Sequence, residues 1–167
     1  MNKKLIYLTA FIIGVVLSTS CSKDNDAKKS TYTFVDQEMQ GKIGGEAWTL
    51  NAGKGEISYF DSTRLSLTFY VEESVDPCNE WLSGNLVMCS VPSKVGLYEF
   101  SFSFSGEGES QTATLYHEET SMNTIATEGA IEITLIDEEN GIIKGRISAE
   151  VDDDDFVNGN FIISYCL

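Results

Sequence analysis

Apolar and polar residues alternate along several stretches of this chain, and the alternation limits the possible fold more than any other feature. The clearest stretch reads LSLTFYV over residues 65–71, and two others read YEFSFSFS over 98–105 and IEITL over 131–135. Successive side chains of a β-strand point to opposite faces, so a period of two gives each stretch one apolar face. No stretch keeps a helical spacing of apolar residues. The pattern predicts an all-β fold.

Further stretches also read as strands, and residues that favour turns separate them. These strands are expected over 41–50, 86–91, 111–118, 142–151 and 160–166. The dipeptide Asn140-Gly141 is a strong hairpin signal, because both residues tolerate a positive φ. About eight closely spaced strands predict a single antiparallel domain, either a β-sandwich or a flattened barrel.

The first 20 residues have the pattern of a secretory signal peptide. Lys3 and Lys4 precede an apolar run, LIYLTAFIIGVVL, which ends at Leu17. A spanning helix needs roughly 20 apolar residues, whereas this run fits the h-region of a signal peptide, which has about 7 to 15. We therefore expect a signal peptide over 1–20, a lipidated N-terminus with a polar tether over 21–33, and one antiparallel β domain over 34–167.

The residues before Cys21 resemble the lipobox of bacterial lipoproteins, in which the signal is cut before a cysteine that receives diacylglycerol. The usual Leu of that box is displaced by one position, because Ser18 takes its place and Leu17 lies further out. Looser boxes of this kind occur in Bacteroidota. The alternative is an ordinary thiol behind a conventional cleavage site. Two or more acyl chains on Cys21 would anchor the protein stably in a bilayer.

The resemblance to lipoproteins also implies a location. Ser22 follows the cysteine where an Asp would favour retention in the inner membrane, so the outer membrane is expected. The stretch SKDND over 22–26 resembles the acidic tract that routes Bacteroidota lipoproteins to the cell surface. Its alternative role is that of a solvated linker.

Five pieces of the domain resemble an uncharacterised family of small all-β Bacteroidota lipoproteins. They read GKIGGEAWTLNAG, SVPSKVGLYEF, EGAIEITLID, IIKGRISAEV and VNGNFIISYC. The shared features concern packing and turns, such as a Gly before an inward Trp and a Gly-x-Phe final strand. The resemblance implies an all-β fold and an envelope location. That family has no assigned activity or catalytic residues, so the resemblance implies nothing about mechanism.

The mature chain is strongly acidic. Removal of residues 1–20 leaves 9 basic and 26 acidic side chains, a net charge of −17. Nucleic-acid binding depends on basic residues that neutralise phosphates, so nucleic acid is excluded as a partner. The charge favours solubility and also suits cationic partners or divalent ions.

The sequence offers no catalytic signature and no cofactor site. Its single histidine, His117, rules out a three-histidine zinc site and an H-E-x-x-H motif, and no G-x-S-x-G elbow accompanies it. We interpret His117 as an exposed or half-buried strand residue. Paired carboxylates of a glycosidase are not excluded in a chain with 26 acidic residues. No catalytic and no metal-binding residue is therefore assigned.

Aromatic residues supply the candidates for ligand contact. The stripe of Phe100, Phe102 and Phe104 would fill the core of a sandwich or line the cavity of an open barrel. Trp48 falls on a predicted strand and is expected to pack, whereas Trp81 lies in the loop-like stretch DPCNEWLSGN. Exposed tryptophans stack on sugars and on protein surfaces, so Trp81 is the candidate binding residue for a glycan or protein ligand.

These observations favour a non-enzymatic recognition or structural module on the cell envelope, with an unknown ligand. One alternative is a carboxylate-based, glycosidase-like hydrolase. Another is a calycin-like carrier of a small apolar ligand. A recognition module requires an exposed aromatic loop, and a hydrolase requires two facing carboxylates in a cleft. A carrier requires an aromatic-lined cavity.

Besides Cys21, the mature chain contains Cys78, Cys89 and Cys166, an odd number for an oxidising compartment. Cys78 and Cys89 are closest in sequence and are predicted to form a disulfide that closes the loop with Trp81. The alternative is a bridge from Cys166 to either of them.

Four consecutive carboxylates, Asp152 to Asp155, lie between two predicted strands. Calcium requires six to eight oxygen ligands, but adjacent residues of an extended chain point to opposite sides. We interpret this stretch as a solvated hairpin tip and predict no strong calcium site.

Overall fold

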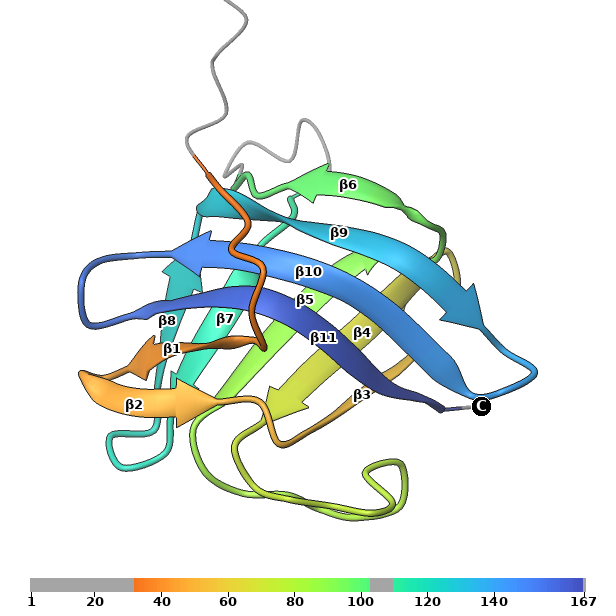
Figure 1. The fold of residues 1–167 in the computed structure, drawn as a ribbon, viewed down its shortest axis with the longest axis horizontal. Coiled ribbons are helices and arrows are strands. Elements are labelled where there is room, and N and C mark those ends of the chain that lie inside the picture. The colour runs from red at the N-terminus through yellow and green to blue at the C-terminus, as the bar shows by residue number, and fades with distance from the viewer. Residues whose placement is uncertain (1–31, 103–109, 167) are drawn as a thin grey trace, which may run out of the picture.

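The computed structural model describes residues 32–102 and 110–166, and its regular elements there are all β-strands (Figure 1). Within these ranges there is therefore no helix that would be long and apolar enough to cross a membrane. The all-β prediction is confirmed. In chain order the strands are β1 Gln40–Ile43, β2 Glu46–Thr49, β3 Ala52–Ile57, β4 Arg64–Tyr70, β5 Leu86–Pro92, β6 Gly96–Glu99, β7 Ala113–His117, β8 Met122–Ala126, β9 Glu128–Asp137, β10 Ile142–Glu150 and β11 Phe156–Cys166.

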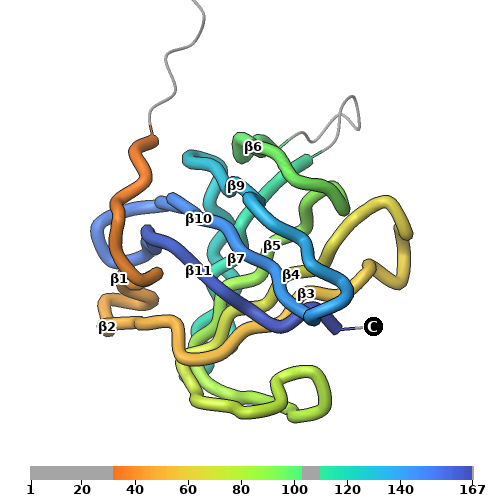
Figure 2. The backbone as a smooth tube through the Cα atoms, turned by 45° about the vertical axis from the view of Figure 1, so that its right-hand side comes forward, coloured from red at the N-terminus to blue at the C-terminus, as the bar shows by residue number. Residues whose placement is uncertain are grey.

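The strands form one strongly curled sheet, which looks like a half-barrel in Figures 1 and 2. Its order is β6-β9-β10-β11-β3-β4-β5-β7-β8, and the β1–β2 hairpin attaches to β11. Neighbouring strands are antiparallel except β11 and β3, which are parallel. The prediction was a sandwich or flattened barrel of about eight strands. The mostly antiparallel all-β fold is confirmed, but the sheet has 11 strands.

The predicted alternation of apolar and polar residues determines which side chains form the inner face of the sheet. Leu65, Leu67 and Phe69 of β4 are at most 1% exposed, while the residues between them are half-buried on the outer face. Phe69 reaches across the curl to Phe161 of β11, with ring centroids 5.0 Å apart. Burial of each such side chain contributes about 1.5–3 kcal/mol, so this inner face supplies most of the stability of the sheet.

Strand β3 reads AGKGEI and was not among the predicted strands. Its two inner positions are glycines, and a Cβ at Gly53 would lie 2.4 Å from Ile163 Cγ2. A Cβ at Gly55 would lie 2.4 Å from Ile143 Cδ1. Side chains of β10 and β11 therefore fill the space that β3 leaves, and β3 needs no apolar pattern of its own.

The predicted strand over 41–50 is a hairpin instead. It turns at Gly44 and Gly45, which have φ values of 65° and 79°. Trp48 of β2 is 2% exposed, and its Nε1 donates a hydrogen bond to the carbonyl oxygen of Asn85, at 2.8 Å. The hairpin therefore pairs with β11 on one side and contacts the beginning of β5 on the other, which closes part of the open side of the curl.

The described chain begins at one end of the molecule, and the connection between β4 and β5 lies at the opposite end (Figures 1 and 2). The first segment is held against the sheet, since Asn158 Nδ2 donates to the carbonyl oxygen of Thr33 at 2.8 Å. The guanidinium of Arg146 lies over the ring of Phe34, 4.4 Å from its centroid. These contacts fix the end of the molecule from which the N-terminal segment approaches.

Candidate functional site

The connection between β4 and β5, residues 71–85, carries Trp81 and folds back on itself. Ser83 N donates to Glu72 Oε2 at 2.9 Å, and the backbone nitrogens of Asn79 and Glu80 donate to the carbonyl oxygen of Asp76 at 3.1 and 3.2 Å. Leu82 is only 9% exposed and anchors the segment on the sheet. We call residues 71–85 the Trp81 loop.

A groove of about 490 Å³ lies between the Trp81 loop and the outer face of the sheet. Residues 80–84 form one wall. Six side chains of four strands line the rest of the sheet side, namely Thr68, Tyr70, Leu86, Met88, Tyr116 and Asn123. Tyr70 pairs with Leu86, Leu86 with Tyr116, and Tyr116 with Asn123, so these four residues form one row across the strands.

The two tryptophans have opposite environments. Trp81 is 98% exposed at the rim of the groove, whereas Trp48 is 2% exposed within the core. The predictions that Trp81 lies in a loop and that Trp48 packs are both confirmed. Whether Trp81 binds a ligand stays a prediction at this point.

Three charged residues line the groove, and they come from separate elements. Lys54 lies on β3, Glu80 on the Trp81 loop and Glu118 just after β7. Ser74 Oγ donates a hydrogen bond to Glu80 Oε2, which fixes that carboxylate within the loop. Burial raises the pKa of the Tyr70 hydroxyl, while its hydrogen bond with Thr68 opposes the rise. Tyr70 therefore stays a neutral hydrogen-bonding group in the groove.

The predicted disulfide between Cys78 and Cys89 is wrong. Cys78 of the Trp81 loop bonds to Cys166 of β11, with the two Cα atoms 5.6 Å apart. Cys89 is a free thiol on the inner face of β5, where it is 5% exposed and its pKa is raised by burial. Cys78 lies outside the sheet, and the pattern of β5 turns Cys89 to the core, so the short separation in sequence does not bring their sulfurs together. The disulfide ties the Trp81 loop to β11.

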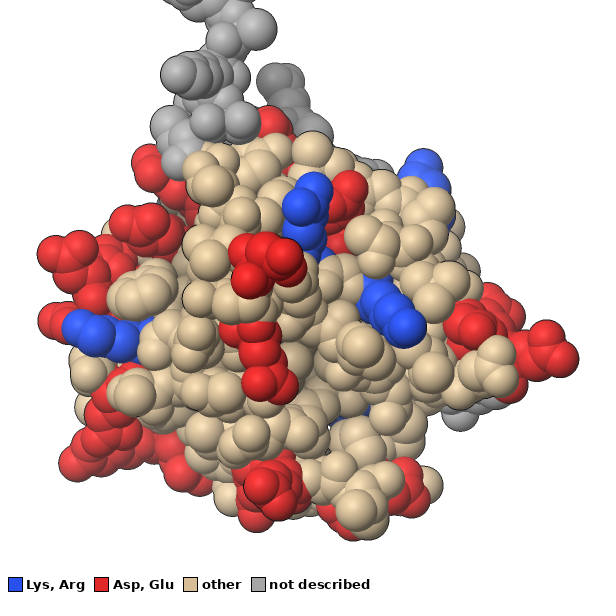
Figure 3. Space-filling view, viewed as in Figure 1, with Lys and Arg blue, Asp and Glu red and all other residues tan. Residues whose placement is uncertain are grey.

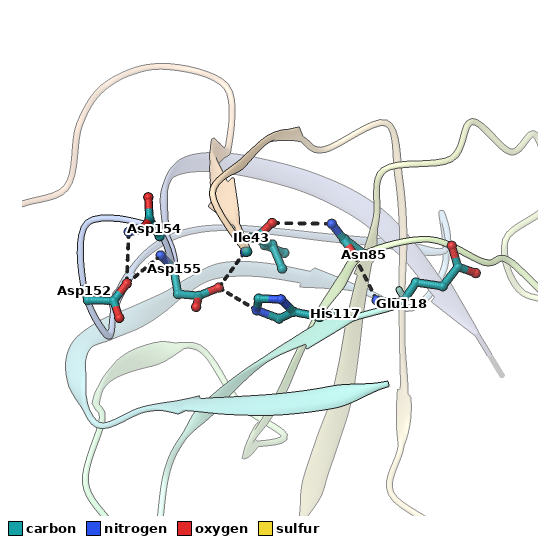
Figure 4. Close-up of polar contacts among 8 residues, drawn as sticks. Ile43, Asn85, His117, Glu118, Asp152, Asp154 and Asp155 are labelled. Carbon is teal, nitrogen blue, oxygen red and sulfur yellow. Dashed lines mark hydrogen bonds and ion pairs between the residues drawn. The ribbon is translucent and has the colours of Figure 1, made fainter. Parts of the chain in front are cut away.

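The single histidine takes part in polar contacts that connect segments distant in the sequence (Figure 4). His117 Nε2 lies 2.7 Å from Asp155 Oδ1, and the same oxygen accepts a hydrogen bond from Gly44 N at 2.9 Å. The side chains of His117 and Asp155 are 17% and 12% exposed. The interpretation of His117 as a half-buried strand residue is confirmed, and its partners give it a structural role in the β1–β2 turn.

Asn85 forms two further hydrogen bonds near the contact between His117 and Asp155. Its Oδ1 accepts a hydrogen bond from Glu118 N at 2.9 Å, and its Nδ2 donates to the carbonyl oxygen of Ile43 at 3.5 Å (Figure 4). The end of β1, the start of β5 and the end of β7 are thereby connected. Glu118 also lines the groove, so the hydrogen bond from its backbone nitrogen to Asn85 positions one end of the groove.

The carboxylates of the Asp152–Asp155 stretch point to different partners. Asp152 Oδ1 accepts from the backbone nitrogens of Asp154 and Asp155, at 2.9 and 3.0 Å. Asp154 Oδ1 lies 3.8 Å from Lys42 Nζ. Over residues 32–102 and 110–166, no cluster of three or more His, Cys, Asp or Glu side chains is arranged to hold a metal ion. That this stretch forms no strong calcium site stays a prediction.

The phenylalanine stripe does not behave as one unit. Phe100 is 6% exposed and joins the core, whereas Phe102 is 43% exposed. Phe104 lies outside the described residues, as do Cys21 and the predicted signal peptide. The interpretation of the stripe as core is therefore confirmed for Phe100 and wrong for Phe102, and it stays a prediction for Phe104.

On the face that Figure 3 shows, most of the surface is uncharged, and acidic side chains gather mainly around its edges, while the basic side chains are isolated. This distribution agrees with the formal net charge of −15 for the whole chain. It leaves no extended basic surface on the face that the figure shows.

Comparison with known proteins gives no match to a family model, to a curated protein or to a solved structure. The resemblance to the lipoprotein family therefore stays a prediction. The groove residues other than Trp81 were not predicted. A signal for them exists, because Tyr70, Leu86, Met88 and Tyr116 occupy outer positions of three strands, where a fully solvated face would carry mostly polar residues.

Proposed function

We propose that this protein is a lipid-anchored recognition module of the cell envelope that binds its ligand in the groove beside Trp81. The observation that carries the proposal is a tryptophan 98% exposed at the rim of a groove with two tyrosines and three apolar side chains in its lining. Amphipathic aromatic side chains of this kind are enriched at binding interfaces.

The order of the Trp81 loop supports this proposal. The hydrogen bonds to Glu72 and Asp76, the burial of Leu82 and the disulfide at Cys78 hold the loop in one position. A ligand that binds a rigid loop does not have to order it, so less binding free energy is lost. An exposed aromatic side chain on such a loop is well suited to recognition.

The placement of the loop fits an anchor at Cys21. The described chain begins at the end opposite the Trp81 loop (Figures 1 and 2). With acyl chains on Cys21, the bilayer would lie on the side of that first segment, and the groove would face away from it. An outer-membrane location at the cell surface would then present the groove to the medium.

We also infer that the sheet forms an incompletely closed, flattened barrel. Ser101 and Gln111 exchange two backbone hydrogen bonds, at 2.7 and 2.8 Å, beyond β6 and before β7. This bridge links the chain after β6, at one edge of the sheet, to the chain before β7, next to the other edge. The β1–β2 hairpin spans the opening from β11 to the start of β5. Its inner face is filled by one apolar cluster that includes Phe69, Phe100 and Phe161, which favours a packed core over the cavity of a carrier.

The proposal is tested by comparing the wild type with Trp81→Ala on a glycan array and in cross-linking to envelope proteins. We expect the variant to lose the ligands that the wild type binds. Equal binding by both proteins would exclude the groove as the site. For the anchor, Cys21→Ala should move the protein from the detergent phase to the aqueous phase, and unchanged partitioning would contradict lipidation.

The hydrolase remains a second candidate because Glu80 and Glu118 line the same groove. A glycosidase needs two carboxylates on either side of the scissile bond. Both residues are exposed in an open groove, whereas an acid catalyst usually lies in a more enclosed pocket. Release of reducing sugar by the wild type, abolished in both Glu80→Gln and Glu118→Gln, would establish hydrolysis instead of binding alone.

A further inference from the structure

The groove beside Trp81 crosses the strands instead of following them. Lys54 of β3 is paired with Thr68 of β4, Thr68 with Met88 of β5, and the parallel row runs from Tyr70 through Tyr116 to Asn123 of β8. Adjacent strands lie about 4.8 Å apart, so five strands from β3 to β8 give the groove a length of about 19 Å along the sheet. A ligand that fills this groove is elongated.

The lining combines flat aromatic surfaces with neutral hydrogen-bonding groups. Trp81 and Tyr116 provide the accessible aromatic surface, and Tyr70, which is only 7% exposed, lies beneath it. Thr68, Ser83 and Asn123 provide hydroxyl and amide groups. A sugar ring offers an apolar C–H face and a rim of hydroxyl groups that both donate and accept. Indole and phenol rings pack against such faces, and hydroxyls and amides can pair with the rim.

We propose that the groove binds a linear, neutral polysaccharide whose chain lies across the strands, with one sugar ring packed against Trp81. This inference rests on the proposed recognition function and specifies its ligand. Asn123, at the β8 end of the groove, pairs with hydroxyls of the chain through its amide oxygen and nitrogen. Lys54, at the β3 end, donates to another hydroxyl. The two residues set the positions at which sugar rings bind along the groove.

An extended peptide fits this groove less well. Peptides that bind to sheets usually add a strand and use main-chain hydrogen bonds. Strands β3, β4, β5 and β7 each pair with a neighbour on both sides, so their main-chain groups are already used within the sheet. Strand addition would have to use the edge of β8, which lies beside the groove and not over its floor.

The charges of the groove disfavour an acidic ligand. Glu80 and Glu118 both line it and carry one more negative charge than Lys54 offsets. The formal net charge of −15 adds repulsion at long range. A polysaccharide without carboxylate or sulfate groups avoids this repulsion, and carboxylates are good acceptors for sugar hydroxyls.

Isothermal titration of the full chain with defined oligosaccharides tests the proposal. The probes are cellohexaose, xylohexaose and mannohexaose as neutral chains, hexagalacturonate as an acidic chain, and cellobiose, xylobiose and mannobiose as short controls. We expect at least one neutral hexasaccharide to bind, at least about tenfold more tightly than its disaccharide, because only the longer chain reaches several contacts in the groove. Hexagalacturonate should bind more weakly than that hexasaccharide.

Three variants locate the binding, and two of them remove exposed aromatic side chains at different places. Trp81→Ala should weaken binding of the neutral hexasaccharide about tenfold or more. Tyr59→Ala removes another aromatic side chain that is 95% exposed, but on the β3–β4 loop, and should leave the affinity unchanged. Asn123→Ala should weaken binding of the hexasaccharide more than binding of the disaccharide.

Several results would overturn the proposal. They are no binding of any neutral hexasaccharide at millimolar concentration, tighter binding of hexagalacturonate, or equal loss in Trp81→Ala and Tyr59→Ala. If no saccharide binds but Trp81→Ala abolishes cross-linking to one envelope protein, the recognition function stands and the polysaccharide is the wrong ligand. If Trp81→Ala keeps all binding, the groove itself is the wrong site.

Discussion

His117 Nε2 lies 2.7 Å from Asp155 Oδ1, so a side chain at the end of β7 is joined to the residue that precedes β11. Asp155 Oδ1 also accepts the hydrogen bond from Gly44 N between β1 and β2. One carboxylate oxygen therefore connects three segments that are far apart in the sequence. This contact adds to the pairing with β11 and to the hydrogen bond of Trp48, which also position the β1–β2 hairpin.

Asp155→Ala should lower the free energy of unfolding by about 2–3 kcal/mol, because it leaves two partly buried donors without their acceptor. Urea denaturation of the two proteins measures the change. Asp153→Ala is the matched control, since Asp153 lies in the same loop and is exposed, and its effect should stay within about 0.5 kcal/mol. Equal destabilisation by both variants would show that the contact with His117 contributes nothing specific.

The two tryptophans should report separately on stability and on the groove. Trp48→Ala removes a buried indole and its hydrogen bond to Asn85, and should lower the free energy of unfolding by about 3–5 kcal/mol. Trp81→Ala should change it by less than about 0.5 kcal/mol. In fluorescence, acrylamide should quench Trp81 in the folded protein and leave Trp48 largely unquenched. A large loss of stability in Trp81→Ala would mean that this indole packs against the domain.

The disulfide should contribute strongly to stability because Cys78 and Cys166 are separated by 88 residues in sequence. In the chain-entropy model, the closure of a loop of that length stabilises the folded state by about 4.6 kcal/mol. Cys166→Ser should therefore lower the free energy of unfolding by about that amount in denaturant titrations. The opposite result, a similar loss in Cys89→Ser with none in Cys166→Ser, would restore the pairing that the sequence suggested.

Thiol mapping gives an independent check on the cysteines. Cys89 is buried and its pKa is raised by that burial, so its reactive thiolate is scarce in the folded protein. We expect iodoacetamide to label Cys89 only after denaturation, while Cys78 and Cys166 become labelled only after reduction. Labelling of Cys89 in the native protein at neutral pH would contradict its position in the core.

Stability should fall at alkaline pH through the tyrosines. Burial raises the pKa of Tyr70, Tyr98 and Tyr165 above the ordinary value of about 10. The unfolded chain then releases these protons at a lower pH than the folded chain, and the folded state loses stability as the pH rises above about 10. Tyr70→Phe should reduce this loss, measured as the change in urea midpoint between pH 8 and pH 11. An unchanged loss would show that Tyr70 ionises equally well in both states.

The alternation of residues predicted the fold class because one inner face is apolar throughout most of the sheet. It located β4, β5, β7, β10 and β11, since each has buried residues at every second position. It also located β9, but there a shift of register opposite Lys144 and Gly145 interrupts the alternation, and Leu135 is 37% exposed instead of facing the core. The Asn140-Gly141 turn also forms as predicted, with a φ of 67° at Gly141. Local sequence patterns were sufficient wherever the strand itself supplies the apolar side chains.

The errors have a different origin, which lies in contacts between distant segments. Strand β3 was missed because its inner positions are glycines that accommodate Ile163 and Ile143. The disulfide was assigned wrongly because nearness in sequence does not reveal that β11 ends beside the Trp81 loop. The groove required the register of four strands before its separate residues could be recognised as one surface.

Strand β11 follows ten other strands in sequence, yet it lies in the middle of the sheet and pairs with β1, β3 and β10. The β1–β2 hairpin and β3 therefore have no partner on that side until residues 156–166 have been synthesised. Sheets with such distant pairings fold slowly, because a long loop must close before the contacts form. During translation the chain would therefore stay without its central strand until its last residues have been added. Completion of the sheet then brings Cys166 to Cys78, so the disulfide can form only after the last central strand has taken its place.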